Sequence, residues 1–219
     1  MDFTVSMALV DFIPVICFAI GAVILMRDLY NKMSKGAYAL FCTGIIDIVV
    51  AGALKAAWKL LAASNICNFS PLNAMFFPVQ SIGFMLAGVG AVAMLCHNQS
   101  EKTLNSFALP TVLLAGAGAL PPEFKGTFIF VGLMVAGLAC LSVTLCILAK
   151  KLGKSALIAV FAVSFVCCLG MGYLSSKDFA EASMNWIAEG VNVVGQGTFL
   201  AGSYLLHKAG LDKLVLERK

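Results

Sequence analysis

Apolar runs long enough to cross a lipid bilayer recur along this sequence, and they constrain its fold more than any other feature. A transmembrane α-helix needs about 20 mostly apolar residues in succession, and in lipid its backbone must satisfy its own hydrogen bonds. Seven segments approach this length: Ala8–Met26, Ala37–Ala63, Leu72–Cys96, Leu104–Leu120, Phe128–Ala149, Ala156–Ser175 and Trp186–Leu206. The sequence therefore predicts an all-α integral membrane protein built as a seven-transmembrane helix bundle.

Composition agrees with this prediction. The 219 residues are 61% hydrophobic and 12% charged, whereas soluble domains are roughly half apolar and a quarter charged. A soluble fold of this size has no interior large enough for so much apolar surface, so the lipid bilayer is the expected partner. The length suits one bundle, and we expect residues 1–219 to form a single transmembrane domain. The net charge of +4 is small and gives no indication of nucleic-acid binding.

The basic residues predict the orientation, because cytoplasmic loops carry an excess of Lys and Arg. The segment Leu104–Leu120 is the weakest candidate, because it is short and contains Pro110. Whether it spans the membrane decides between six and seven spans. With seven spans and the N-terminus outside, the outer loops hold only Lys125 and Lys177. The inner loops and tail then hold Arg27, Lys32, Lys35, Lys102, Lys150, Lys151, Lys154, Lys208, Lys213, Arg218 and Lys219. We expect a multi-pass protein of the cell membrane with its N-terminus outside and its C-terminus inside.

A weak internal similarity raises the alternative of a parallel repeat. "KMSKGA" (Lys32–Ala37) and "KLGKSA" (Lys151–Ala156) follow the first and fifth segments, and "LAG" recurs in the third and seventh. Two three-helix units joined by a fourth helix would have the same orientation, as in parallel-repeat transporters. Chance recurrence of such short words is the other explanation. The three-one-three arrangement is similar to that of small sugar facilitators and PQ-loop proteins. The third segment, however, reads "PVQ" (Pro78–Gln80) where a PQ dipeptide is needed, so no functional residue is carried over.

Small residues also recur at every fourth position of the third segment, at Gly83, Ala87 and Ala91. This spacing lets helix backbones approach closely in lipid. Small residues are also common in membrane helices without such a role.

Polar residues inside the apolar runs are the candidates for a site. The second segment contains Asp47 near mid-membrane, Lys55 about 12 Å further along the helix and Lys59 one turn beyond. Ionisable groups at such depths cost several kcal/mol unless they are paired or hydrated, so they should face one another or a cavity. A lysine as close to the helix end as Lys59 also has a simpler option, since its side chain can extend to the headgroups.

The other polar positions fall on shared helix faces. We predict substrate-binding roles for Asp47, Lys55, Lys59, Asn73, Gln80, Glu189, Asn192 and Gln196, with Asp11 as an additional candidate. The alternative is a structural cluster of ion pairs that only fixes helix packing. Lysines for a carboxylate and Glu189 for an ammonium suit a small polar or zwitterionic solute. Asp47, removed from water, would favour its protonated form and could carry a proton. The prediction is a small transporter or facilitator with an outward-facing pocket between the first, second, third and seventh helices.

Two other classes remain as alternatives. A seven-helix chain with short inner loops also suits a receptor or sensor, but not a retinal protein, since the seventh segment has no lysine before Lys208. An intramembrane enzyme acting on lipid ranks third. The two histidines, His97 and His207, are expected at inner helix ends facing headgroups, and no serine-elbow or paired His/Asp pattern is present. We predict no catalytic residue, no metal and no cofactor.

Overall fold

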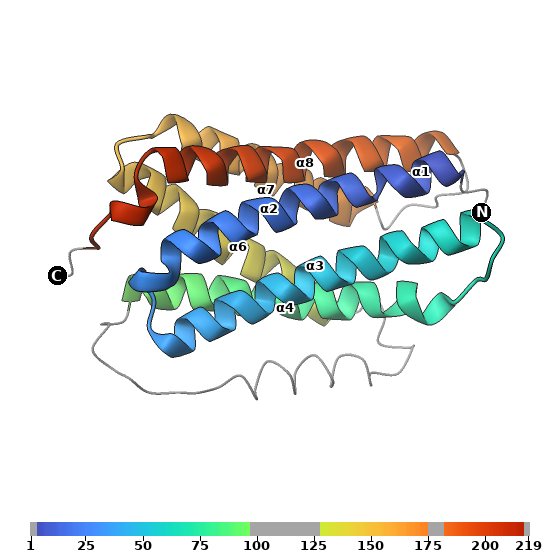
Figure 1. Cartoon of the computed structure of the whole chain (residues 1–219), viewed down its shortest axis with the longest axis horizontal. Coiled ribbons are helices and arrows are strands. Elements are labelled where there is room, and N and C mark those ends of the chain that lie inside the picture. The colour runs from blue at the N-terminus through green and yellow to red at the C-terminus, as the bar shows by residue number, and fades with distance from the viewer. Residues whose placement is uncertain (1–3, 97–127, 175–181, 217–219) are drawn as a thin grey trace.

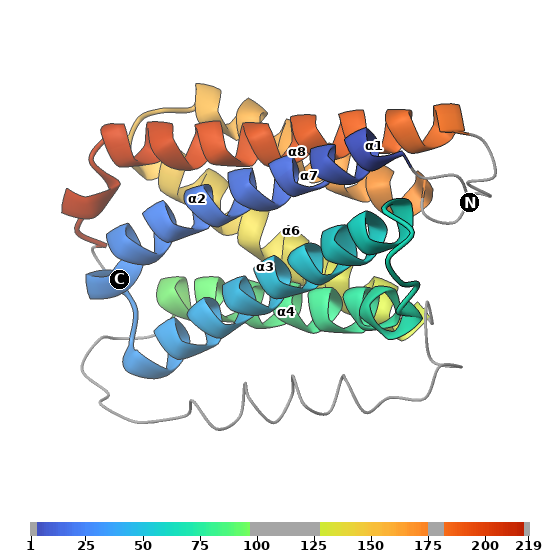
Figure 2. The same ribbon diagram turned by 45° about the vertical axis from the view of Figure 1, so that its right-hand side comes forward.

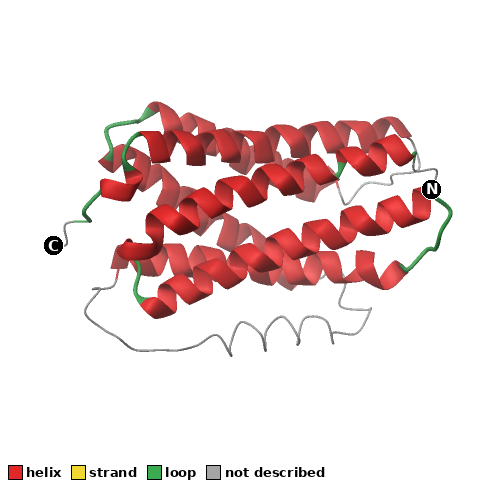
Figure 3. Cartoon of the chain, in the orientation of Figure 1, coloured by secondary structure: helices red, strands yellow, loops and turns green. Residues whose placement is uncertain are grey.

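The computed structural model describes residues 4–96, 128–174 and 182–216, and within these ranges it is helical, with no strand (Figure 3). The α-helices are α1 (Val5–Val10), α2 (Phe12–Leu29), α3 (Lys35–Ala63), α4 (Ser70–Cys96), α6 (Phe128–Lys151), α7 (Ala156–Leu174) and α8 (Ala182–Lys208), with 3₁₀ turns at Tyr30–Lys32 and Leu211–Lys213. They run roughly side by side along the length of the molecule (Figure 1).

Four helical stretches in the described part of the chain are long and apolar enough to cross a membrane. These are Val5–Lys32, Lys35–Ala63, Ser70–Cys96 and Ile129–Lys151. α7 contributes a shorter apolar helix, Ala156–Met171, and α8 has 27 residues but is the most polar of the long helices. The chain is thus a helical protein with several helices suited to membrane insertion. The predicted span Leu104–Leu120 lies outside the described residues.

Local chemistry explains the division between α1 and α2. Pro14 has no backbone N–H, and its ring would clash with the carbonyl of Val10 in a continuous helix. The chain accordingly turns at Asp11, the C-terminal cap of α1 and the first flanking residue of α2. The Asp11 side chain makes no capping hydrogen bond to α2. Its carboxylate is therefore available for contacts with other helices.

In the described ranges, the six long helices form a closed ring. Extensive contacts join α2 to α3, α3 to α4, α4 to α6, α6 to α7, α7 to α8 and α8 back to α2, with the α3–α4 contact the largest. The two views in Figures 1 and 2 show α2 and α8 running along one side of the ring and α3 and α4 along another. Such a ring places one face of each helix toward a common axis.

Small residues set the closest helix crossings. A Cβ atom on Gly44 of α3 would collide with the backbone of Gly83 and Ala87 in α4. A Cβ on Gly137 of α6 would collide in the same way with the backbone of α4 at Phe84. Gly83, Ala87 and Ala91 are all buried, and Gly83 and Ala87 lie at the α3 crossing. This confirms the close approach predicted from their spacing.

Buried apolar side chains fill the interior of the ring at the end that contains the C-termini of α2 and α8. Large apolar side chains from four helices are fully buried there: Leu25, Met94, Leu145, Leu148 and Leu206. We call these five residues the apolar plug. The opposite half of the ring, near α1, is the less completely filled half and contains the cavity described next.

Candidate ligand-binding cavity

A cavity of about 140 Å³ lies inside the ring, in the half that contains the N-terminal part of α2 and the C-terminal part of α3. A cavity of this size is comparable to one that holds a benzene-sized ligand. All six helices of the ring contribute to its wall. The residues that carry the argument are Asp11, Phe18, Lys55, Phe76, Phe77, Gln80, Phe84, Glu189, Asn192 and Gln196.

The wall is largely apolar and aromatic. Phe18 and Phe84 meet edge to face with ring centroids 6.3 Å apart, and Phe18 stacks on Phe199 at 4.9 Å. Met134 and Leu138 of α6 complete the apolar side. Ligand sites in proteins commonly combine such a wall with a few polar groups that fix the orientation of the ligand.

A buried three-residue ion cluster forms one edge of the cavity. The Lys59 Nζ lies 2.5 Å from Asp11 Oδ2 and 2.6 Å from Glu189 Oε1. All three side chains are less than 10% exposed. Two carboxylates thus share one ammonium, and the cluster has one negative charge in excess when all three groups are ionised. Asp11 and Glu189 line the cavity, so the excess charge borders it.

Glu189 keeps one acceptor uncommitted. Its Oε2 is buried and has no hydrogen-bond partner among the described residues. A buried carboxylate oxygen without a donor costs free energy, because it has lost water without a replacement. This oxygen therefore favours a ligand that brings a donor into the cavity.

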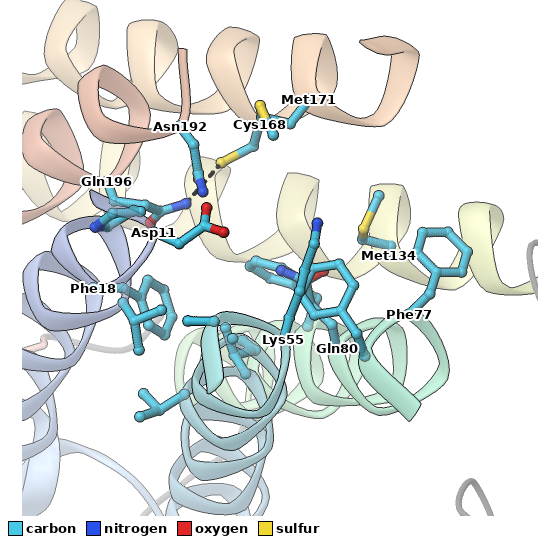
Figure 4. Close-up of a pocket in the computed structure, with 18 of the residues that line it drawn as sticks. Asp11, Phe18, Lys55, Phe77, Gln80, Met134, Cys168, Met171, Asn192 and Gln196 are labelled. Carbon is cyan, nitrogen blue, oxygen red and sulfur yellow. Dashed lines mark hydrogen bonds between the residues drawn. The ribbon is translucent and has the colours of Figure 1, made fainter. Parts of the chain in front are cut away.

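Lys55 lies one helical turn from Lys59 on the same face of α3, but its environment differs. Its Nζ lies 4.2 Å from the centroid of the Phe76 ring, and no carboxylate of the described residues lies within ion-pair distance of it. Figure 4 shows its side chain extending from α3 into the cavity, with Asp11 and Asn192 across from it. A cation over an aromatic face is attracted by the ring, but the ring does not neutralise its charge.

Three amide side chains add hydrogen-bonding groups. The Gln196 Nε2 donates to Cys168 Sγ at 3.5 Å (Figure 4), which is a weak bond because sulfur is a poor acceptor. Gln80 and Asn192 line the cavity without a hydrogen bond to any other described residue. The cavity thus offers both donors and acceptors.

A smaller chamber lies next to the cavity, toward the apolar plug. The two share Phe18, Phe84, Leu138, Cys168 and Gln196 as lining residues. The chamber is otherwise bordered mainly by apolar groups of α6, α7 and α8, including Leu141, Phe161 and Phe199. The aromatic pair Phe18–Phe84 therefore stands between the cavity and more deeply buried apolar space.

Six of the nine predicted candidates come together at this cavity: Asp11, Lys55, Gln80, Glu189, Asn192 and Gln196. Lys59 is not a lining residue of the cavity, but it contacts two lining residues, Asp11 and Glu189. The Lys59 side chain therefore forms ion pairs inside the helix bundle instead of extending to the headgroups. The expected meeting of the α3 lysines with Glu189 and Asp11 is thus found for Lys59.

Asp47 and Asn73 lie elsewhere. Asp47 is 1% exposed, and its Cβ is close to Gly83 at the α3–α4 crossing, outside the cavity lining. Both of its carboxylate oxygens are without a hydrogen-bond partner in the described ranges. Asn73, in the first turns of α4, is exposed. Seven-residue spacing places Asn73 and Gln80 on one face, but α4 extends beyond the cavity at its N-terminal end.

His207 also differs from the expectation that it faces lipid headgroups. Its Nδ1 lies 2.9 Å from Asp28 Oδ2, and Arg27 lies 3.1 Å from its Nε2. Lys32 Nζ donates to the carbonyl of Asp212 at 2.9 Å. These contacts tie α2 to α8 and to the turn after it, next to the apolar plug. His97 lies outside the described residues.

The sequence did not identify the contributions of α6 and α7. Met134, Leu138, Cys168 and Met171 line the cavity, but they are apolar or weakly polar residues within apolar helices. The phenylalanines of α2 and α4 were missed for the same reason. Nothing in their spacing distinguishes a cavity wall from a lipid-facing surface.

Comparison with known proteins adds no assignment. No family model, no curated protein and no solved structure matches the chain. Within the described ranges, no group of three or more His, Cys, Asp or Glu residues is arranged to hold a metal ion.

Proposed function

We propose that this protein is a small membrane transporter or facilitator that binds a polar or zwitterionic solute in the cavity of its six-helix ring. The observation that carries the proposal is a pair of polar groups at the cavity that lack partners among the described residues: the Lys55 amine, which has no carboxylate within ion-pair distance, and the buried Glu189 Oε2, which has no donor. A cluster serving only to pack helices would satisfy its charges internally, because unpaired buried charges destabilise a fold.

The proposed topology has seven spans, with the N-terminus outside and the C-terminus inside the cell membrane. The distribution of charge in the described residues supports it. Arg27, Lys32, Lys35, Lys150, Lys151, Lys154, Lys208 and Lys213 all lie at the end of the ring that holds the apolar plug. Under the positive-inside rule this end faces the cytoplasm, and the cavity then lies in the outer half of the membrane.

The contact pattern supports the repeat. If α2, α3 and α4 form one unit and α6, α7 and α8 the other, the order of contacts around the ring is the same in both. The α4–α6 contact in one half corresponds to the α8–α2 contact in the other. Repeats of this kind place substrate sites at their interface, and relative movement of the two units gives alternating access.

The test begins with ligand-dependent thermal stabilisation of the purified protein by a panel of amino acids, small carboxylates, sugars and nucleosides. Solutes that stabilise the protein are then assayed for uptake into proteoliposomes. We expect uptake, and we expect Lys55→Met to reduce it strongly. Lys208→Met is the matched control, because Lys208 also lies over an aromatic ring, that of Tyr204 at 5.0 Å, but far from the cavity.

The assay also separates the alternatives. A receptor or sensor would be stabilised by a solute without transporting it in either variant. Stabilisation by lipids alone, with no response to any solute, would contradict the proposal.

A further inference from the structure

The charges around the cavity are separated into two regions of opposite sign. At one edge, Asp11 and Glu189 share Lys59, and the buried Glu189 Oε2 has no hydrogen-bond partner among the described residues. At the other, the Lys55 Nζ lies 4.2 Å from the centroid of the Phe76 ring, with no carboxylate of the described residues within ion-pair distance. Lys55 and Lys59 are four residues apart, which is about 6 Å of rise along the helix. The Lys55 side chain and Asp11 both extend into the same cavity (Figure 4).

A ligand with one charge satisfies only one of these regions. A simple carboxylate would pair with Lys55 but leave the Glu189 oxygen without a donor. A simple amine would satisfy Glu189 but add a cation near Lys55. A molecule with an ammonium and a carboxylate on the same carbon atom satisfies both, and it adds no net charge to a buried site.

The remaining wall determines what the rest of the molecule must be. Phe18, Phe84, Met134 and Leu138 are apolar members of the cavity lining. A second space of about 10 Å³, bordered mainly by apolar residues together with Ser142, Ser164, Cys168 and Gln196, adjoins Phe18 and Phe84. A polar side chain placed against the four apolar lining residues would lose hydration there, because none of them carries a hydrogen-bonding side chain; only Gln80, Asn192 and Gln196 elsewhere in the lining offer amide partners. An apolar side chain would gain from removal of its surface from water.

We propose that the cavity binds an α-amino acid with an apolar side chain no larger than that of leucine. The carboxylate pairs with Lys55, the ammonium donates to Glu189, and the side chain points toward Phe18 and Phe84. This inference rests on the proposed function, because it names the substrate class of the same site.

The experiment measures binding of four probes to the purified full-length protein. These are leucine, its analogue without the ammonium (4-methylpentanoate), its analogue without the carboxylate (3-methylbutylamine), and serine, which keeps both charges but has a polar side chain. We expect leucine to bind most tightly. Loss of a hydrogen bond to a charged group should weaken each single-charge analogue by about 10- to 100-fold.

Two variants assign the two ends of the ligand. Lys55→Met should weaken binding of leucine and 4-methylpentanoate and should not weaken 3-methylbutylamine, which loses a nearby like charge. Glu189→Gln should weaken leucine and 3-methylbutylamine but leave 4-methylpentanoate unchanged. Lys208→Met should alter none of them. This crossed pattern cannot arise from partial unfolding, because a misfolded variant would lose all probes together.

The outcomes separate this inference from the function on which it rests. Equal binding of leucine and 4-methylpentanoate, or tighter binding of serine than of leucine, would overturn the apolar amino acid as the ligand. Uptake of a sugar or nucleoside in a Lys55-dependent manner, with no response to leucine, would also overturn it and leave the transporter proposal intact. Leucine binding without uptake of any solute would overturn the transporter proposal alone, and absence of both binding and uptake would overturn both.

Discussion

Lys59 lies between two buried carboxylates, and each of the three charges depends on the other two. Lys59→Met would leave Asp11 and Glu189 close together without a counter-charge. Removing one side of a buried pair typically costs about 3–5 kcal/mol, so we expect a clear fall in the melting temperature in detergent. Glu189→Gln should cost less, because Lys59 keeps its contact with Asp11 at 2.5 Å.

The rescue variant tests the geometry of this cluster. Combining Lys59→Met with Asp11→Asn and Glu189→Gln removes all three charges and should recover much of the lost stability. Lys55→Met serves as the control, since Lys55 has no carboxylate to leave unpaired. Additive losses across the triple variant would show that the three groups do not interact.

Asp47 is the most deeply buried of the ionisable candidates, and it lacks a counter-charge in the described part of the chain. Asp47→Asn keeps its volume and removes the cost of a charge at mid-membrane. Because both carboxylate oxygens are unpartnered, we expect the melting temperature to stay constant or rise. If Asp47 carries a proton in transport, gradient-driven accumulation in proteoliposomes should also be lost while exchange without a gradient persists. A lower melting temperature would indicate a stabilising partner for the carboxylate.

The sequence could predict which polar residues share the cavity only where helix periodicity decides their position. Glu189, Asn192 and Gln196 lie on one stripe of α8, and all three line the cavity. Asp47 and Lys55 lie on the same helix, but they face different neighbours, α4 and the cavity respectively. The helix that packs against each face of α3 is determined by the tertiary arrangement of the ring. The sequence of α3 alone does not contain this information.

At the scale of the elements, the apolar runs predicted the six described long helices closely. The predicted Ala37–Ala63 is α3 from Lys35 to Ala63, and Leu72–Cys96 is α4 from Ser70 to Cys96. The break at Asp11 was not predicted, although Pro14 provides the physical reason for it. The seventh predicted segment, Leu104–Leu120, remains a prediction.

The helix crossings make a testable distinction between two glycines of α6. In Gly137→Ala the new Cβ would collide with the α4 backbone at Phe84 and Met85. Overpacking of this kind costs about 1–3 kcal/mol, so the melting temperature should fall. Gly132→Ala is the matched control, because nothing lies within 4 Å of its added Cβ. Alanine is the better helix former by about 1 kcal/mol, so this variant should be unchanged or slightly stabilised. Equal effects of the two would argue against the α4–α6 contact.

At the scale of the whole molecule, the ring and the distribution of charge describe a polarised structure. The end with the apolar plug is basic and closed by buried side chains and by the contacts of Asp28 with His207. The end with the cavity has apolar and aromatic walls and a buried ion cluster. A transporter in one of its two access states would have this asymmetry, open toward one side and packed toward the other.

Two native cysteines test which side is which. Cys67, between α3 and α4, and Cys96, at the end of α4, are both exposed, and they lie at opposite ends of that helix. If the basic end faces the cytoplasm, a membrane-impermeant maleimide applied to intact cells should label Cys67 and spare Cys96. Permeabilised cells should give labelling of both. Cys67→Ser should remove the signal from intact cells.

That variant then provides the background for new probes of the complete topology. With Cys96→Ser added to remove the remaining exposed native cysteine of the described residues, Lys151→Cys at the end of α6 should react only after permeabilisation, because the positive-inside rule places this loop in the cytoplasm. Lys125→Cys and Lys177→Cys, in the predicted outer loops, should react in intact cells. The reactions of Cys67 and Lys125→Cys together decide the number of spans. If Cys67 reacts from outside and Cys96 does not, residue 96 lies inside; if Lys125→Cys reacts from outside, the chain crosses the membrane an odd number of times between residues 96 and 125. Leu104–Leu120 is the predicted span in that interval. Labelling of both Lys151→Cys and Cys96 in intact cells, with Cys67 spared, would reverse the orientation, and the cavity would then lie in the cytoplasmic half of the membrane. Labelling of Lys151→Cys together with Cys67 would show that Leu104–Leu120 does not span.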